Sequence, residues 1–269
     1  MKKVSSDKYT KDYFLSSCEG GKLWQRKKGT ELTPRLQHAV SLVKIKPGDQ
    51  VLDFGCGRGE IASYAAKKGA TVLAVDYAPE ALKLCRQTVK KLPPKISKRI
   101  KIIQANVESL EAAKNSFDLI FLIDVFEHLT NHELNLLLTK FYNSLKTGGT
   151  LLIHTAPNKQ FYNIGFPFYT RWANLLISPF WKLIFHEEKI QLDSDPRAEH
   201  DHELHINEQT VESLKAWLNK TGYLSQVWLD SRFHAIRFRD KLNYALLTPI
   251  WIPGLSRFFT RDIWALGKK

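Results

Sequence analysis

The chain of 269 residues lacks the features that mark disulfide-rich, secreted and membrane-spanning proteins. Its three cysteines, Cys18, Cys56 and Cys85, are odd in number and form no CxxC pair, so neither a disulfide framework nor a structural zinc site is expected. No run of about 18 apolar residues exists to cross a bilayer, and the first residues contain no apolar signal-peptide segment. We therefore expect a globular protein in a reducing, cytoplasmic compartment.

Acidic residues are scarce relative to basic ones. Lys and Arg number 40 against 27 Asp and Glu, which gives a net charge of +13. The hydrophobic share of 43% is ordinary for a folded protein and excludes a disordered chain. The charge favours an anionic partner such as nucleic acid, a phospholipid surface or a phosphorylated substrate, although solubility alone would also explain it.

Short apolar runs alternate with amphipathic helical patterns between Pro34 and Thr155, which predicts βαβ units and a parallel sheet. The expected strands are 51–54, 71–76, 100–105, 117–124 and 150–155. The expected helices between them are 60–68, 79–92 and 131–145. A helix at 208–221, with Asn207 as its N-cap, and strands at 223–230 and 262–266 follow later.

The pattern divides the chain into a core and its additions. Residues 34–156 and 204–269 form the predicted core domain, and residues 1–33 form short helices or an arm outside the core. Residues 157–203 form an apolar, aromatic cap insertion, and residues 233–259 form a second insertion of the same kind.

A glycine-rich loop, Gly55-Cys56-Gly57-Arg58-Gly59, joins the first strand to its helix, where open α/β sheets bind ligands. The pattern is GxGxG and lacks the last glycine of the dinucleotide fingerprint. Asp53 precedes the loop and would repel a pyrophosphate but attract an ammonium group. Asp76, at the end of the second strand, is placed to bind two ribose hydroxyls. S-adenosylmethionine combines an ammonium group, a ribose and an adenine without phosphates.

Five ordered motifs carry a family resemblance. They are residues 51–60 (VLDFGCGRGE), 74–79 (AVDYAP), 104–108 (QANVE), 117–129 (FDLIFLIDVFEHL) and 145–151 (LKTGGTL). The chain thus resembles the class I S-adenosylmethionine-dependent methyltransferases. The resemblance implies an α/β fold with a seven-stranded, mostly parallel sheet whose last strand is antiparallel.

The same resemblance implies cofactor-binding roles for eight residues. The methionine part is assigned to Asp53, Gly55 and Gly57, the ribose to Asp76 with Tyr77 beside it, the adenine to Asn106 and Val107, and the region nearest the methyl group to Asp124. Many family members have Asp where Asn106 stands. Outside these roles, Cys56 is expected to pack the loop, Arg58 to be solvated and Asp118 to support the fold.

His128 is the candidate catalytic base because it follows the fourth strand beside the predicted methyl group. The Asp124-x-x-Glu127-His128 spacing is similar to the divalent-metal site of ubiquinone-pathway O-methyltransferases, where Glu usually occupies the first position. The alternative is a structural role in which the histidine caps the next helix. A divalent metal is therefore compatible with the sequence, but no metal site is predicted.

Four other histidines are candidates for a site role or a packing role. His200, His202 and His205 form a cluster that either binds metal, lines the acceptor pocket or lies in a solvated loop. His154, inside the fifth strand, is expected to be a packing position.

The aromatic insertion allows three interpretations: a lid that forms an apolar acceptor pocket, a membrane-interface segment whose Arg171 and Lys182 meet anionic headgroups, or a dimer surface.

The predicted function is methylation of a small or lipid-like acceptor, most simply at a hydroxyl oxygen. The protein would be cytoplasmic, with a possible peripheral place on the inner face of a membrane. An RNA methyltransferase and a cofactor-binding scaffold without turnover are the alternatives; nucleic acid is disfavoured because no Asn/Asp-Pro-Pro-aromatic motif follows the fourth strand.

Overall fold

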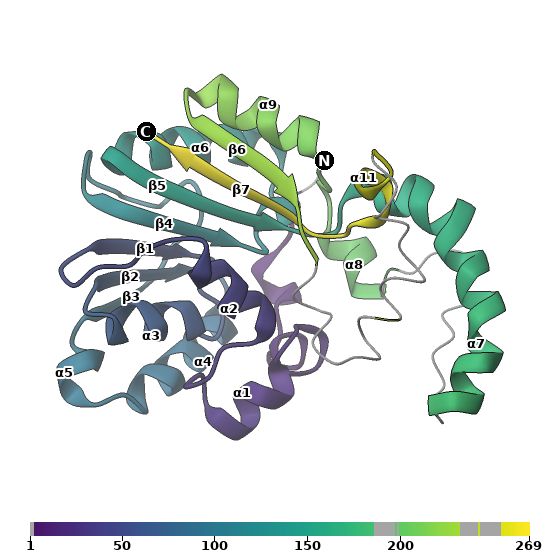
Figure 1. The fold of residues 1–269 in the computed structure, drawn as a ribbon. Helices are drawn as coiled ribbons and strands as arrows, with labels where there is room; N and C mark the ends of the chain where they lie inside the picture. The colour runs from purple at the N-terminus through teal and green to yellow at the C-terminus, as the bar shows by residue number, and fades with distance from the viewer. Residues whose placement is uncertain (1–2, 186–196, 198, 232–241, 243–253) are drawn as a thin grey trace.

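The computed structural model describes residues 3–185, 197, 199–231, 242 and 254–269. A seven-stranded sheet organises this part of the chain, in the order β3-β2-β1-β4-β5-β7-β6 (Figure 1). The strands are β1 (Gln50–Phe54), β2 (Thr71–Asp76), β3 (Ile100–Gln104), β4 (Phe117–Ile123), β5 (Leu145–Thr155), β6 (Leu224–Leu229) and β7 (Ile263–Lys268). The first five are parallel, and β7 runs antiparallel between β5 and β6, as predicted.

The described residues form helices that cover both faces of the sheet and others that lie beyond its edge (Figure 1). They are α1 (Gly21–Lys27), α2 (Pro34–Ser41), α3 (Glu60–Lys67), α4 (Pro79–Lys90), α5 (Pro94–Ser97), α6 (Asn131–Ser144), α7 (Arg171–Phe185), α8 (Glu199–Leu204), α9 (Val211–Thr221) and α11 (Ser256–Phe259). Short 3₁₀ or π turns are η1 (Ser6–Lys8), η2 (Tyr13–Ser17), η3 (Phe126–His128) and η4 (Phe161–Thr170). Residues of α6 and α9 share one apolar cluster with the sheet, whereas α2, α3 and α4 share the cluster on the other face.

Most predicted elements lie within a few residues of the observed ones, but α9 begins later than expected. Thr210, not Asn207, is its N-cap: Thr210 Oγ1 accepts the Ser213 N–H, and Ser213 Oγ accepts the Thr210 N–H. The Asn207 amide instead donates to the Leu129 carbonyl at 2.9 Å, which ties this segment to the loop after β4. The N-cap prediction was wrong because that tertiary contact occupies the asparagine.

The N-terminal arm (residues 3–27) forms short helices, as predicted, but the expectation that it lies outside the core was wrong. Tyr9, Phe14 and Trp24 are buried and pack against α4 and Leu204. The Trp24 indole N–H donates to Thr88 Oγ1 of α4 at 2.8 Å. The aromatic side chains therefore anchor the arm across the sheet's ligand edge.

The cap insertion is described for residues 157–185 and part of 197–204, and 186–196 and 198 lie outside the described residues. The second insertion is described only at 242 and 254–259, so its apolar run from Tyr244 to Pro253 lies outside them as well. The domain boundaries expected from the sequence therefore stay a prediction. Each helix among the described residues is too short or too polar to cross a bilayer.

Candidate active site

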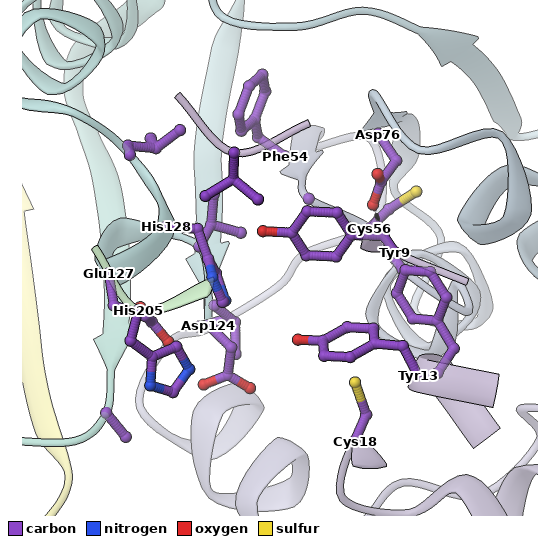
Figure 2. A pocket seen from close by; sticks show the side chains of 18 of the residues that line it. Tyr9, Tyr13, Cys18, Phe54, Cys56, Asp76, Asp124, Glu127, His128 and His205 are labelled. Atoms are coloured by element: carbon purple, nitrogen blue, oxygen red, sulfur yellow. Dashed lines mark hydrogen bonds between the residues drawn. The ribbon is translucent and has the colours of Figure 1, made fainter. Parts of the chain in front are cut away.

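A pocket of about 520 Å³ lies beyond the carboxyl ends of β1, β2 and β4 (Figure 2). Its wall includes the glycine loop, the ends of β2 and β3, the loop after β4, the N-terminal arm and α8. All nine residues proposed from the sequence line it: Asp53, Gly55, Gly57, Asp76, Tyr77, Asn106, Val107, Asp124 and His128. The topology therefore gathers side chains that are up to 75 positions apart in the sequence into one cavity.

The glycine loop adopts a backbone that its residue types permit. Gly55 has φ of 78°, and a Cβ added there would overlap the Val125 side chain. The N–H groups of Gly55 and Cys56 both donate to the Val75 carbonyl, at 2.8 and 2.9 Å. Only glycine meets the steric and dihedral demands at position 55 together, so the loop stays close to the pocket.

Two buried carboxylates flank this loop. Asp53 Oδ2 accepts the Ala62 N–H of α3 at 3.1 Å, and Asp76 accepts the N–H groups of Gly57 and Ala78, both at 2.9 Å. Burial raises the pKa of Asp53 to about 7, opposed by the Ala62 hydrogen bond and reinforced by the charge of Asp76. Burial also raises the pKa of Asp76 to about 6.

No cationic side chain of the described segments pairs with either acid. Within the described part of the chain, their hydrogen-bond partners are backbone N–H groups. Each carboxylate therefore has bonding capacity left for a ligand with hydroxyl or ammonium donors.

Asn106 lines the pocket, but its amide oxygen is already engaged. Asn106 Oδ1 accepts from the N–H and the hydroxyl of Ser109, both at 2.8 Å. A contact between this oxygen and an adenine amino group would compete with that turn. The side-chain NH₂ of Asn106 remains available as a donor toward the pocket.

Asp124 occupies the opposite end of the pocket and is held by two cations. Its φ of 56° places it in the left-handed region directly after β4. Arg35 Nη2 lies 2.9 Å from Asp124 Oδ2, and His154 Nδ1 binds Oδ1. Burial opposes ionisation, but Arg35 and His154 outweigh it and hold the pKa of Asp124 below its usual range.

His154 does more than pack inside β5. Its second ring nitrogen, Nε2, lies 3.1 Å from Asp262 Oδ1 beside β7, so the fully buried ring bridges two carboxylates. Burial favours neutral imidazole, but the charges of Asp124 and Asp262 raise the pKa of His154 to about 9. His154 is therefore an imidazolium at neutral pH that fixes the orientation of Asp124.

His128 lies in η3, next to Asp124 in the pocket wall (Figure 2). His128 Nδ1 lies 3.0 Å from the Leu204 carbonyl, which can only accept, so Nδ1 carries the proton and Nε2 keeps its lone pair. Burial and the nearby His205 lower the pKa of His128 to about 4. At neutral pH this side chain is an uncharged imidazole with one acceptor nitrogen.

Glu127, His128 and His205 form a compact trio in which one ligand atom from each lies within 4.8 Å of the others. His205 Nδ1 is buried and has no hydrogen-bond partner among the described residues. Burial, with the charge of Asp124, raises the pKa of Glu127 to about 8. One carboxylate and two imidazoles are a donor set that suits a divalent transition metal, so these residues fit such an ion. From the second histidine cluster, His200 and His205 line the pocket and His202 does not.

Sequence reasoning missed the wall that the N-terminal arm supplies. Tyr9, Tyr13 and Phe14 line the pocket, and the hydroxyls of both tyrosines point toward the side that holds His128 and Asp124 (Figure 2). The prediction of a solvated Arg58 was also wrong. Arg58 is buried and donates to the Phe14 and Glu19 carbonyls at 2.6 Å each, which fastens the arm to the glycine loop.

Comparison with known proteins gives a consistent result. A methyltransferase domain family matches residues 51–149. The chain is 33% identical over 122 residues to a ubiquinone biosynthesis O-methyltransferase of Xanthomonas campestris pv. campestris, with 45% of this chain and 48% of that protein covered. It is 31% identical over 158 residues to the mitochondrial ubiquinone biosynthesis O-methyltransferase of Rattus norvegicus, with 56% and 44% covered. The chain thus spans about half the length of these curated relatives.

The fold is also found in solved structures. Phosphoethanolamine N-methyltransferase 2 of Haemonchus contortus, in complex with S-adenosyl-L-methionine, superposes with a TM-score of 0.61 at 18% identity, over 99% of this chain and 60% of that one. Residues 51–149 thus resemble a methyltransferase domain, and the fold of the chain is one that this solved N-methyltransferase shares.

Proposed function

We propose that this chain transfers the methyl group of S-adenosylmethionine to a hydroxyl oxygen of a small apolar or lipid-like acceptor. The observation that carries the proposal is the pairing, at the Asp124 end of the pocket, of an aromatic wall with a neutral histidine. Tyr9 and Tyr13 form that wall, and the His128 acceptor nitrogen belongs to the same cavity. An aromatic cavity favours an apolar acceptor, and a neutral imidazole suits a hydroxyl that must lose its proton.

The cofactor would lie between the two ends of the pocket. We assign Asp76, with Tyr77 beside it, to the ribose hydroxyls, and Asp53 with the loop of Gly55 and Gly57 to the methionine part. Asn106 and Val107 border the adenine. Asp124 then lies nearest the sulfonium and its methyl group.

The reaction needs little from the protein beyond alignment and exclusion of water, because the sulfonium is already activated. The acceptor oxygen attacks the methyl carbon in line with the carbon–sulfur bond, which breaks and leaves S-adenosylhomocysteine. His128 Nε2 takes the hydroxyl proton as the oxygen–carbon bond forms. Asp124, oriented by Arg35 and His154, stays ionised and faces the positive charge that the reaction consumes.

If a divalent ion binds, His128 would act as a metal ligand and not as a base. Glu127, His128 and His205 would hold it, and it would lower the pKa of an acceptor hydroxyl that binds to it. Chelation separates the two cases. Turnover that survives EDTA supports His128 as the base, and turnover lost to EDTA and restored by one divalent metal supports the trio as ligands.

The acceptor class is tested by measuring S-adenosylhomocysteine formation by mass spectrometry with a panel of apolar phenols, fatty acids, amines and RNA. We expect product with apolar phenols or other hydroxyl acceptors. His128→Ala should abolish most of it, and His132→Ala, at an exposed histidine of α6, should not. Product formed only with RNA or amines would refute the proposed acceptor. A peripheral position on an anionic membrane is the remaining part of the proposal.

A further inference from the structure

Helix α7 exposes an apolar stripe. Trp172, Leu176, Phe180 and Leu183 are 55%, 72%, 68% and 74% exposed, and they recur at intervals of three or four residues. Leu175 and Ile184 widen the stripe, and Phe168 in η4 extends it. Spacing of this kind places all these side chains along one side of the helix.

Two polar residues of the same segment, Thr170 and Ser178, are buried on the other side. They are only 6% and 4% exposed, and Trp181 is buried beside them. A surface helix of a globular protein normally buries its apolar side and exposes its polar side. Here the arrangement is reversed, so the outer side of α7 is built for an apolar environment.

The charge of the segment is of one sign. Residues 157–185 contain Lys159, Arg171 and Lys182 and no Asp or Glu. The Arg171 guanidinium lies over the Trp172 ring, 5.7 Å from its centroid. Aromatic side chains that enter the acyl boundary, next to cations that meet headgroups, are the composition of helices that lie in the interface of anionic membranes.

The position of α7 links this surface to the pocket. η4 runs directly into α7, and Tyr162 of η4 lines the pocket together with Arg261. In Figure 1, α7 extends along one side of the molecule, away from the sheet. A helix docked on a bilayer would therefore hold this wall of the pocket near the membrane surface.

We propose that the outer side of α7 docks in the interface of an anionic lipid bilayer, with Trp172, Leu176 and Phe180 in the acyl boundary. The lack of acidic residues over 29 consecutive positions favours anionic lipid over a second copy of the chain, whose stripe would bring like charges together. The inference rests on the membrane position in the proposed function and deepens it by naming the docking surface, and it requires no particular acceptor.

The test is co-sedimentation of the full chain with vesicles of zwitterionic lipid alone or with 30% phosphatidylglycerol. We expect binding to the anionic vesicles that falls at least tenfold in Leu176→Asp/Phe180→Asp, since two apolar anchors are lost and two negative charges are added. Leu224→Asp is the matched control, because Leu224 is an equally exposed leucine, at 78%, on β6. It should bind as the unmodified chain does.

A second pair of variants isolates the electrostatic contribution. Arg171→Glu/Lys182→Glu should weaken binding about tenfold or more, whereas Lys95→Glu/Lys98→Glu, at exposed cations of the α5 region, should have a much smaller effect. Absence of binding to any vesicle would overturn the proposal. So would equal loss in both pairs, or an unmodified chain that is dimeric and becomes monomeric in Leu176→Asp/Phe180→Asp.

Calorimetry with S-adenosylhomocysteine and turnover of a water-soluble acceptor, both without vesicles, check that the variants remain folded. These readouts also keep the two proposals separate. Turnover without vesicle binding refutes the docking surface alone, and vesicle binding without turnover refutes the proposed activity alone.

Discussion

The two ends of the pocket handle negative charge in opposite ways. At the end assigned to the cofactor's ribose and methionine, burial raises the pKa values of Asp53 and Asp76, and their hydrogen-bond partners among the described residues are backbone N–H groups. At the end assigned to the methyl group, Arg35 and His154 lower the pKa of Asp124. In the proposed assignment, a ligand supplies the remaining partners of Asp53 and Asp76, whereas Arg35 and His154 of the protein itself supply those of Asp124. Changes at the first end should thus alter affinity, and changes at the second should alter turnover or stability.

The largest expected effect is on turnover. His128→Ala should lower kcat by about 10²–10⁴-fold, the usual contribution of a general base, and leave the Kd for S-adenosylhomocysteine nearly unchanged. Single-turnover kinetics and calorimetry measure the two quantities. His132→Ala is the matched control, and an unchanged kcat in His128→Ala would leave the histidine with only a structural role.

The next effect is on stability. His154→Gln removes a buried cation from between Asp124 and Asp262, and such a loss lowers the free energy of unfolding by about 3–5 kcal/mol. Urea denaturation measures it, with His132→Gln as the control. A stability equal to that of the unmodified chain would show that the bridge does not carry charge in the folded protein.

His154 also determines how the stability of the folded chain changes with pH. Its pKa is raised in the folded chain from about 6.5 to about 9, so its contribution is fully present below pH 6.5 and is lost as the pH rises toward 9. His154→Gln should therefore be less sensitive to pH between 6.5 and 9 than the unmodified chain.

A smaller effect is expected on the affinity for S-adenosylhomocysteine, at the end of the pocket assigned to the cofactor. Asp76→Asn should weaken S-adenosylhomocysteine binding by about tenfold to a hundredfold, because a charged acceptor for ribose hydroxyls becomes a neutral one. Glu111→Gln neutralises an exposed acid and should leave the affinity unchanged. Equal affinities in both variants, measured by calorimetry, would place the ribose elsewhere.

The smallest expected effect is a change of affinity for S-adenosylhomocysteine with pH, which is measured first on the unmodified chain. With the pKa of Asp76 raised to about 6, the ionised fraction rises about tenfold between pH 5 and pH 7, and affinity for S-adenosylhomocysteine should rise by a similar factor. Asp53, whose pKa is raised to about 7, acts in the same direction. Asp76→Asn should reduce this dependence to the part that Asp53 contributes, and affinity independent of pH in the unmodified chain would contradict the assigned pairing.

The sequence predicted the surroundings of Asp53 and Asp76 better than those of Asp124, for a physical reason. Alternating apolar runs and the glycine loop are local signals, and parallel topology then brings Asp53, Asp76 and Asp124 to one edge. The Arg35–Asp124 and His154–Asp262 contacts join residues 89 and 108 positions apart. No spacing rule reveals such pairs, so His154 was expected to be a packing residue.

The same limit applies to the arm and to α8. Buried Tyr9, Phe14 and Trp24 were visible as aromatics in a polar segment, but nothing local showed which surface they cover. His205 becomes a neighbour of His128 only when α8 returns to the ligand edge, where the two ring centroids lie 5.0 Å apart. The residue types were readable from the sequence, and their partners were not.

The arm that forms part of the pocket wall contributes no strand to the sheet, and Arg58 of the glycine loop holds it through the Phe14 and Glu19 carbonyls. If the arm selects the acceptor, as its place in the pocket wall suggests for the proposed function, we expect exchange of this one segment to change acceptor preference without a change in the sheet. Chimeras that swap residues 3–19 between relatives should keep their affinity for S-adenosylhomocysteine while they gain or lose individual acceptors.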